Sequence, residues 1–243
     1  MIKILISFLI CFAASKHLIM IGDGRIQEMA QVLMNVGLKE YRYGAFEYKY
    51  LVTESPISYE GYDLDIIAVN KNTIKHLFDG GQPYISVHDK LKKATPGTSV
   101  ILNLGIQNLD YYNDIFVFYG KLADKYKNLN FYIVSLIGLN DGDPKTNIAV
   151  KDFNKRVEKR IKIVGFKNLY YKDILNNNDP SQIIVNNELI HILDYSTDSV
   201  GFFRNGYIRI FKAMVEGLGN TSLIIINKKF KLKKMNKNYY FIF

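Results

Sequence analysis

Short apolar runs and amphipathic segments alternate along the chain, separated by residues that favour turns. In the amphipathic segments apolar positions recur three and four residues apart, which is the spacing of a helix with one buried face. The predicted strands are residues 17–21, 65–69, 99–104, 131–136 and 168–171. The predicted helices are residues 26–37, 73–78, 86–94, 111–126, 146–164 and 205–216. This alternation predicts a three-layer α/β fold, in which helices cover both faces of a parallel sheet.

Two further features refine this prediction. The stretch from Tyr41 to Tyr62 is aromatic and irregular, and we interpret it as a hairpin. The first strand ends in Gly22-Asp23-Gly24, which predicts a tight turn before the first helix. Because ligands of such sheets bind at the carboxyl ends of the strands, this turn is a candidate functional position.

The first fifteen residues have the pattern of an export signal. Lys3 precedes an apolar run over residues 4–14, and the small residues Ala13 and Ser15 form a cleavage arrangement. The run is too short to cross a bilayer, which takes about 20 residues. A buried first strand is the alternative. Removal of residues 1–15 would also remove Cys11, the only cysteine, and with it any disulfide or cysteine-based site.

Composition predicts one folded domain over residues 16–221. The chain has 243 residues, of which 48% are hydrophobic and 23% charged. Its formal net charge is +9, but six lysines lie within residues 227–243 and Lys3 lies in the signal, so the rest carries only +2. We therefore expect no nucleic-acid partner. Residues 222–243 are predicted to be an appended basic and aromatic tail, or a segment that touches an anionic surface or membrane.

Three segments at predicted strand ends or before the last helix resemble the sequence blocks of the SGNH/GDSL hydrolases, especially the GDSR-type branch. They read IGDGRIQEM at residues 21–29, LGIQNL at 104–109 and DSVGFFRNGYIRIF at 198–211. Their order and spacing agree with that family over residues 16–217. The resemblance implies a flavodoxin-like fold and a site for ester hydrolysis.

The family's chemistry uses a serine nucleophile, a histidine base and an aspartate that orients the histidine. Matched block by block, the nucleophile position is Gly24 and the base position is Gly201. Asp198 matches the orienting acid, yet it has no imidazole to orient. Loss of the nucleophile or its base costs about 10⁶ in turnover. The resemblance therefore implies a protein without the family's esterase activity.

The oxyanion-binding positions are also altered. Gln107 and Asn108 replace the Asn and Asp of the third block, and no glycine occurs near Lys71-Asn72, where the second block is expected. Asp23 is retained, as is Arg25, and both are expected to shape the turn around Gly24. The candidate binding or oxyanion-like positions are therefore Asp23, Gly24, Gln107 and Asn108.

Other residues offer weaker catalytic candidates. Glu188 and His191 form an acid-x-x-His arrangement, which leaves open an active esterase with a rearranged site. Ser135 ends a predicted core strand, where a serine is usually bonded to backbone. His76 and His88 show no metal-ligand spacing with carboxylates, so we expect no metal and no cofactor.

These observations predict an exported or extracytoplasmic SGNH-like protein that binds an acyl, glycan or lipid ligand in the former cleft. Two alternatives stay open at this point. One is an active ester hydrolase that uses His191. The other is a structural or surface-interaction protein whose cleft is vestigial and whose basic tail contacts anionic surfaces.

Overall fold

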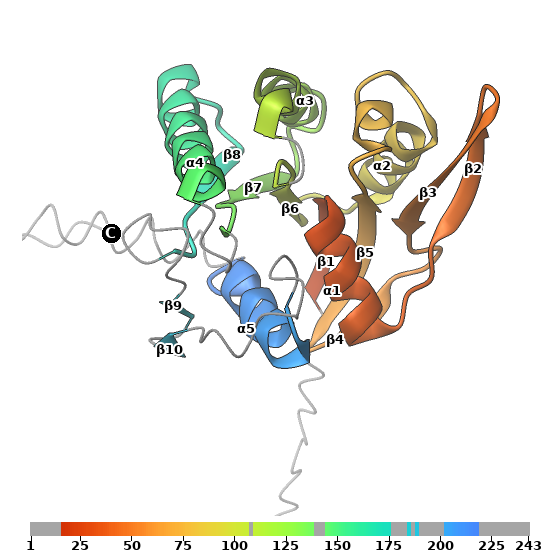
Figure 1. The fold of residues 1–243 in the computed structure, drawn as a ribbon, viewed down its shortest axis with the longest axis horizontal. Coiled ribbons are helices and arrows are strands. Elements are labelled where there is room, and N and C mark those ends of the chain that lie inside the picture. The colour runs from red at the N-terminus through yellow and green to blue at the C-terminus, as the bar shows by residue number, and fades with distance from the viewer. Residues whose placement is uncertain are drawn as a thin grey trace, which may run out of the picture.

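The computed structural model describes residues 16–106, 109–138, 144–175, 184–185, 188–189 and 202–218. Its centre is a mixed sheet in the order β2-β3-β5-β1-β6-β7-β8, with β4 also paired to β5 (Figure 1). The strands are β1 (Lys16–Gly22), β2 (Lys39–Tyr43), β3 (Phe46–Val52), β4 (Ile57–Tyr59), β5 (Tyr62–Val69), β6 (Ser99–Asn103), β7 (Asn130–Val134) and β8 (Leu169–Lys172), with a separate pair β9 (Ile184–Val185) and β10 (Glu188–Leu189). The helices are α1 (Gly24–Met34), α2 (Gln82–Lys93), α3 (Tyr112–Lys125), α4 (Pro144–Val164) and α5 (Arg204–Val215), with short 3₁₀ turns η1 (Ile74–Leu77) and η2 (Leu109–Tyr111).

The five strands from β5 to β8 are parallel, as the sequence predicts. On the central strand β1, Gly22 is aligned with Ala68 of β5 and with Asn103 of β6. The carboxyl ends of these three strands therefore meet at one edge of the sheet. That edge holds the turn at Asp23-Gly24.

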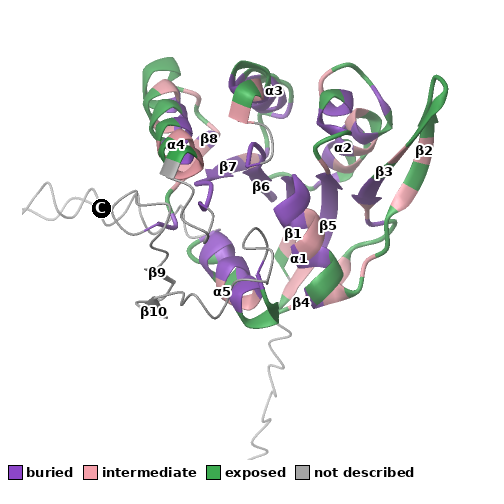
Figure 2. Ribbon diagram, in the orientation of Figure 1, coloured by how far each residue is buried: buried purple, intermediate pink, exposed green. Residues whose placement is uncertain are grey.

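Helices cover both faces of the sheet, which confirms the predicted three layers. Helices α2, α3 and α4 lie on one face, and α1 and α5 lie on the other (Figure 1). On β1, Ile19 and Ile21 belong to the core under the first group, whereas Leu18 and Met20 belong to the core under the second. All four side chains are at most 1% exposed, and the central strands are buried over most of their length (Figure 2). Burial of each such side chain stabilises the fold by about 1.5–3 kcal/mol.

One edge of the sheet is antiparallel. The aromatic stretch forms two hairpins, β2–β3 and β4–β5, where the sequence predicts one. The second hairpin turns at Glu60-Gly61, and both residues have positive φ. Antiparallel neighbours need only such short turns, whereas each parallel strand needs a crossover, so the helix-free stretch can extend the sheet only in this way.

Two predicted helix boundaries are wrong. Helix α1 ends at Met34 and not at residue 37 as predicted, because Asn35, with a φ of 54°, forms a left-handed cap. Asparagine adopts this conformation more readily than most residues, because its polar side chain can bond locally. Helix α2 begins at Gln82, four residues before the predicted start, with Pro83 in its first turn. The predicted signal at 1–15 and the whole of the predicted tail at 222–243 lie outside the described residues.

Candidate functional site

The turn after β1 is built around a buried carboxylate. Asp23 is fully buried and precedes the first residue of α1. Its Oδ1 accepts a hydrogen bond from the backbone N–H of Arg25 at 3.3 Å. Its Oδ2 accepts from the N–H groups of Gly105 and Ile106 at 2.8 and 2.9 Å. Asp23 therefore joins the end of β1 to the loop after β6.

Burial raises the pKa of the Asp23 carboxyl above its usual range. The backbone N–H groups of Gly105, Arg25 and Ile106 and the Arg25 charge act in the opposite direction. Both carboxylate oxygens are thus occupied by the protein's own backbone. The residue shapes the turn, as the sequence analysis expects, and it is not placed to act as a base on a ligand.

Gly24, the predicted nucleophile position, is the first residue of α1 and is buried. It follows directly from the carboxyl end of the central strand, which is where the resemblance implies a serine. Glycine supplies no atom that could attack an ester carbonyl.

Arg25 links the turn to the next strand ends. Its side chain donates to the backbone carbonyl of Ile137 and to that of Gly138 at 2.7 Å, both just beyond β7. Its guanidinium also lies 5.2 Å from the centre of the Phe202 ring. The residue is 7% exposed, so its charge is held across the strand ends by carbonyls and an aromatic face. The sequence places Arg25 in the turn but does not predict this link.

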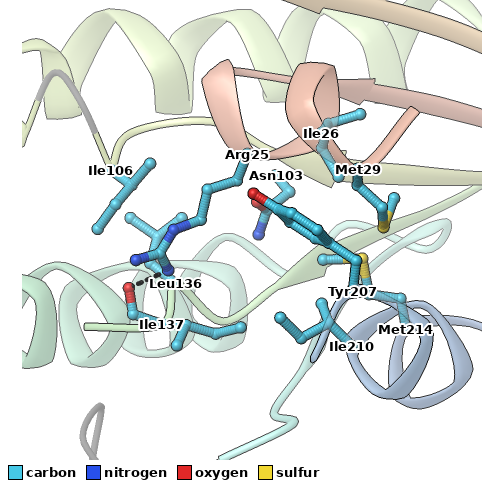
Figure 3. A pocket seen from close by; sticks show the side chains of 10 residues that line it. All are labelled: Arg25, Ile26, Met29, Asn103, Ile106, Leu136, Ile137, Tyr207, Ile210 and Met214. Atoms are coloured by element: carbon cyan, nitrogen blue, oxygen red, sulfur yellow. Dashed lines mark hydrogen bonds between the residues drawn. The ribbon is translucent and has the colours of Figure 1, made fainter. Parts of the chain in front are cut away.

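The space beside Arg25 is small. A cavity of about 10 Å³ lies between the strand ends, α1 and α5, which is room for roughly one water molecule (Figure 3). Tyr207 closes one side of the cavity, and its hydroxyl donates to Glu28 Oε2. Burial, together with Glu28, raises the pKa of Tyr207 far above its usual range, so this hydroxyl stays protonated. The lining residues are Arg25, Ile26, Met29, Asn103, Ile106, Leu136, Ile137, Tyr207, Ile210 and Met214.

Several predicted site residues lie outside the described part of the chain. They are Gln107, Asn108, His191, Asp198 and Gly201. Their predicted roles stay predictions. The described neighbours Ile106 and Phe202 both lie near the Asp23-Gly24-Arg25 turn, through the contacts with Asp23 and Arg25 given above.

The second-block position is a polar turn. Lys71 and Asn72 follow β5 and are exposed. The N–H of Asn72 donates to Asn70 Oδ1 at 3.0 Å. This N–H is therefore already bonded and does not offer a hydrogen bond to an oxyanion.

The weaker candidates have structural partners. Ser135 is fully buried, and its hydroxyl accepts from the N–H of Ile174 at 3.0 Å. His88 Nδ1 is 2.6 Å from the Tyr126 hydroxyl, and His76 is packed edge-on against Tyr43 and Tyr48. Within the described ranges no group of three or more histidine, cysteine or acidic side chains could hold a metal ion.

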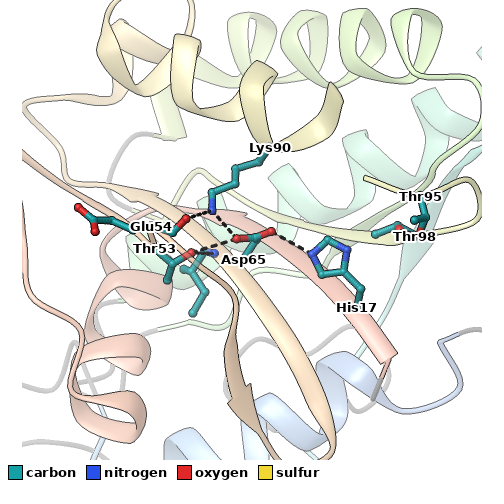
Figure 4. Close-up of polar contacts among 8 residues, drawn as sticks. His17, Thr53, Glu54, Asp65, Lys90, Thr95 and Thr98 are labelled. Atoms are coloured by element: carbon teal, nitrogen blue, oxygen red, sulfur yellow. Dashed lines mark hydrogen bonds and ion pairs between the residues drawn. The ribbon is translucent and has the colours of Figure 1, made fainter. Parts of the chain in front are cut away.

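A second polar cluster lies between β1, β5 and α2 (Figure 4). Asp65 is 5% exposed, and one of its oxygens is 2.5 Å from Lys90 Nζ. The other oxygen is 2.9 Å from His17 Nε2, and Thr53 Oγ1 donates to the carboxylate at 3.3 Å. The cluster pairs a buried acid with two basic side chains. The sequence does not predict this cluster, because its members lie far apart along the chain.

Comparison with solved structures supports the fold class. A protein from Streptococcus pneumonia named for platelet activating factor matches with a TM-score of 0.51 and 11% identity, over 86% of this chain and 85% of that one. A GDSL-like lipase from Bacteroides thetaiotaomicron matches with a TM-score of 0.49 and 10% identity, over 83% and 86%. An acetyl xylan esterase from Geobacillus stearothermophilus matches with a TM-score of 0.49 and 12% identity, over 85% and 95%.

Comparison at the level of sequence gives no relative. No model of a protein family and no curated protein matches the chain. Among the described helices, none is both long and apolar enough to cross a membrane. The similarity to the first of these structures, with its TM-score of 0.51, is thus one of fold alone, a three-layer α/β architecture.

Proposed function

We propose that this chain is a non-hydrolytic protein with an SGNH/GDSL-hydrolase-like fold, which binds an acyl, glycan or lipid ligand where such enzymes cleave esters. The observation that carries the proposal is Gly24. The residue occupies the buried turn at the carboxyl end of β1, between the fixed side chains of Asp23 and Arg25. A turn built in this way presents backbone to a ligand and no nucleophile.

The cavity lining favours an acyl group among these three ligand classes. Seven of its ten residues are aliphatic or methionine side chains, and Arg25, Asn103 and Tyr207 are the polar ones. Apolar lining suits a hydrocarbon chain and leaves sugar hydroxyls without partners. Because the cavity has room for one water only, an acyl chain would enter as flexible side chains such as Met29 and Met214 move.

Ester hydrolysis tests the loss of activity. The purified chain would be assayed with short acyl-nitrophenyl esters and acetylated sugars, beside the Gly24→Ser/Gly201→His double variant. The natural chain is expected to match the uncatalysed rate, whereas the double variant gains turnover. A Gly24→Ala/Gly201→His variant is the matched control, since it adds similar bulk at both positions without a hydroxyl.

One result would replace this proposal with an active esterase. Turnover by the natural chain that disappears in His191→Ala would assign the base to His191. The proposal also predicts saturable binding of octanoate by calorimetry. Ile210→Trp, which fills the cavity, should abolish that binding, and the similarly sized Ile210→Leu should keep it.

The small cavity also favours a second candidate function, that of a surface-interaction protein with a vestigial cleft. Its basic side chains would come from residues 227–243. Retention on anionic vesicles or acidic polysaccharide would then be lost when residues 227–243 are deleted. If the deletion leaves retention unchanged and the chain binds octanoate, the second candidate function is excluded and the first proposal stands.

A further inference from the structure

A larger groove lies between α2 and α3, on the opposite face of the sheet from the α1–α5 cavity. Its volume is about 710 Å³, against about 10 Å³ at the strand ends. Ligand sites usually measure about 300–1,000 Å³. The groove is therefore large enough for a ligand, and no motif in the sequence predicts it.

Aromatic rings form the walls of this groove. Phe78 follows η1 and packs edge-on against Phe118 of α3, with 5.6 Å between ring centres. Tyr84 of α2 packs edge-on against His88, with 4.2 Å between ring centres. These contacts fix the rings before any ligand arrives, which lowers the entropy that binding would cost. A ring held in this way offers an apolar face to the C–H groups of a ligand.

His88 adds a polar group to the lining of the groove. The residue lines the groove and is only 8% exposed. Its Nδ1 is 2.6 Å from the Tyr126 hydroxyl, and that hydroxyl also lies 3.4 Å from the His88 carbonyl oxygen. Nε2 is thus the ring nitrogen that remains for a ligand hydroxyl.

The charged residues along the groove balance one another. Asp114 and Asp124 are exposed acceptors on α3, and Lys121 and Lys125 are exposed donors on the same helix. With two charges of each sign the groove has no net formal charge, so it offers no electrostatic preference for an anion or a cation. Carboxylates and ammonium groups both bond well to hydroxyls.

We propose that the α2–α3 groove binds a neutral sugar, with a ring stacked on Tyr84 and its hydroxyls bonded to the His88 imidazole and the α3 carboxylates. Three features of the groove point to this class: its size, its fixed aromatic walls and its balanced charges. A phosphate-bearing ligand would need an excess of basic groups, and a fatty acyl chain would leave His88 and the four charged residues unused.

The test is calorimetric titration of the full chain with three neutral trisaccharides: xylotriose, maltotriose and triacetylchitotriose. At least one is expected to bind saturably. Tyr84→Ala should weaken that binding about tenfold, which corresponds to the loss of one stacked ring. Ile85→Ala is the matched control, because Ile85 is the exposed neighbour on α2 and does not line the groove.

A second pair of variants keeps the proposal testable if Tyr84→Ala does not fold. Asp114→Asn should weaken binding several-fold while the fold is unchanged, since Asp114 is exposed. Asp89→Asn, an exposed acid of α2 outside the groove, should bind as the natural chain does. The proposal is overturned if none of the trisaccharides binds, or if Tyr84→Ala and Asp114→Asn both bind with unchanged affinity. Binding of octanoate that Ile210→Trp removes concerns the other cavity, so the two proposals fail separately.

Discussion

Two buried carboxylates of this protein are stabilised by different kinds of partner. At the strand ends, the Asp23 carboxylate is satisfied by backbone N–H groups, so it fixes the chain without a charged partner side chain in hydrogen-bond contact. Beneath α2, the Asp65 carboxylate is instead paired with the basic side chains of Lys90 and His17, so Asp65 and Lys90 depend on each other for a charged partner. A buried ion that loses its partner is costly, whereas an exposed pair contributes little.

This contrast gives a residue-scale prediction for Asp65→Asn. The substitution keeps the size of the side chain and leaves Lys90, whose side chain is 14% exposed, without its carboxylate. The free energy of unfolding should fall by about 2–4 kcal/mol in urea denaturation. Glu47→Gln, which breaks the exposed 2.9 Å pair with Arg42, should change it by less than about 1 kcal/mol. Equal losses in the two variants would contradict the argument.

At the scale of elements, the end of β6 approaches α4 so closely that only glycine fits between them. Gly105 has a φ of +129°, and a Cβ there would lie 2.9 Å from the Phe153 ring. The two N–H groups bonded to Asp23 belong to Gly105 and Ile106, so this approach also positions the turn around Gly24.

Gly105→Ala should therefore destabilise the protein by about 2–4 kcal/mol, through both backbone strain and the clash. Gly97→Ala is the control, because Gly97 has a φ of +85° and nothing within 4 Å of its Cβ position. It should cost only about 1–2 kcal/mol, the price of a left-handed conformation. Thermal or urea unfolding of both variants measures the difference, and a control loss as large as that of Gly105→Ala would argue against a steric role.

The sequence predicts the individual strands and helices better than the pairings and side-chain contacts between them. Parallel strands such as β1 and β6 are continuous apolar runs, because both faces are buried, and so their positions along the chain could be predicted. The antiparallel edge was less visible, since Tyr41 and Tyr48 meet only after the strands pair. At the candidate site the pattern located Asp23, Gly24 and Arg25. It could not show where the Arg25 guanidinium ends, because Ile137 is 112 positions away along the chain.

For the whole molecule, the two faces of the sheet have different cavities. Among the described residues, the face covered by α1 and α5 has a cavity of about 10 Å³ at the strand ends, and the face covered by α2, α3 and α4 has a groove that His88 helps to line. His88 belongs to the packed core as well as to the groove, being hydrogen-bonded to Tyr126 and in ring contact with Tyr84. Its protonation therefore affects the stability of the entire fold.

Burial lowers the pKa of His88 to about 4, and Lys125 and Lys92 act in the same direction while Asp89 opposes them. An unfolded histidine has a pKa of about 6.5. Between these two values the unfolded chain takes up a proton that the folded chain does not, so stability is full above pH 6.5 and decreases as the pH falls toward 4. We expect His88 to account for about 2 kcal/mol over this window. In His88→Gln, which has no proton to gain, unfolding free energies measured from pH 7 to 4.5 should decline less steeply by that amount. Tyr126→Phe leaves the imidazole buried, so its unfolding free energy should depend on pH as steeply as that of the natural chain. A weaker pH dependence in Tyr126→Phe, or the same pH dependence in all three proteins, would show that His88 is not the group responsible.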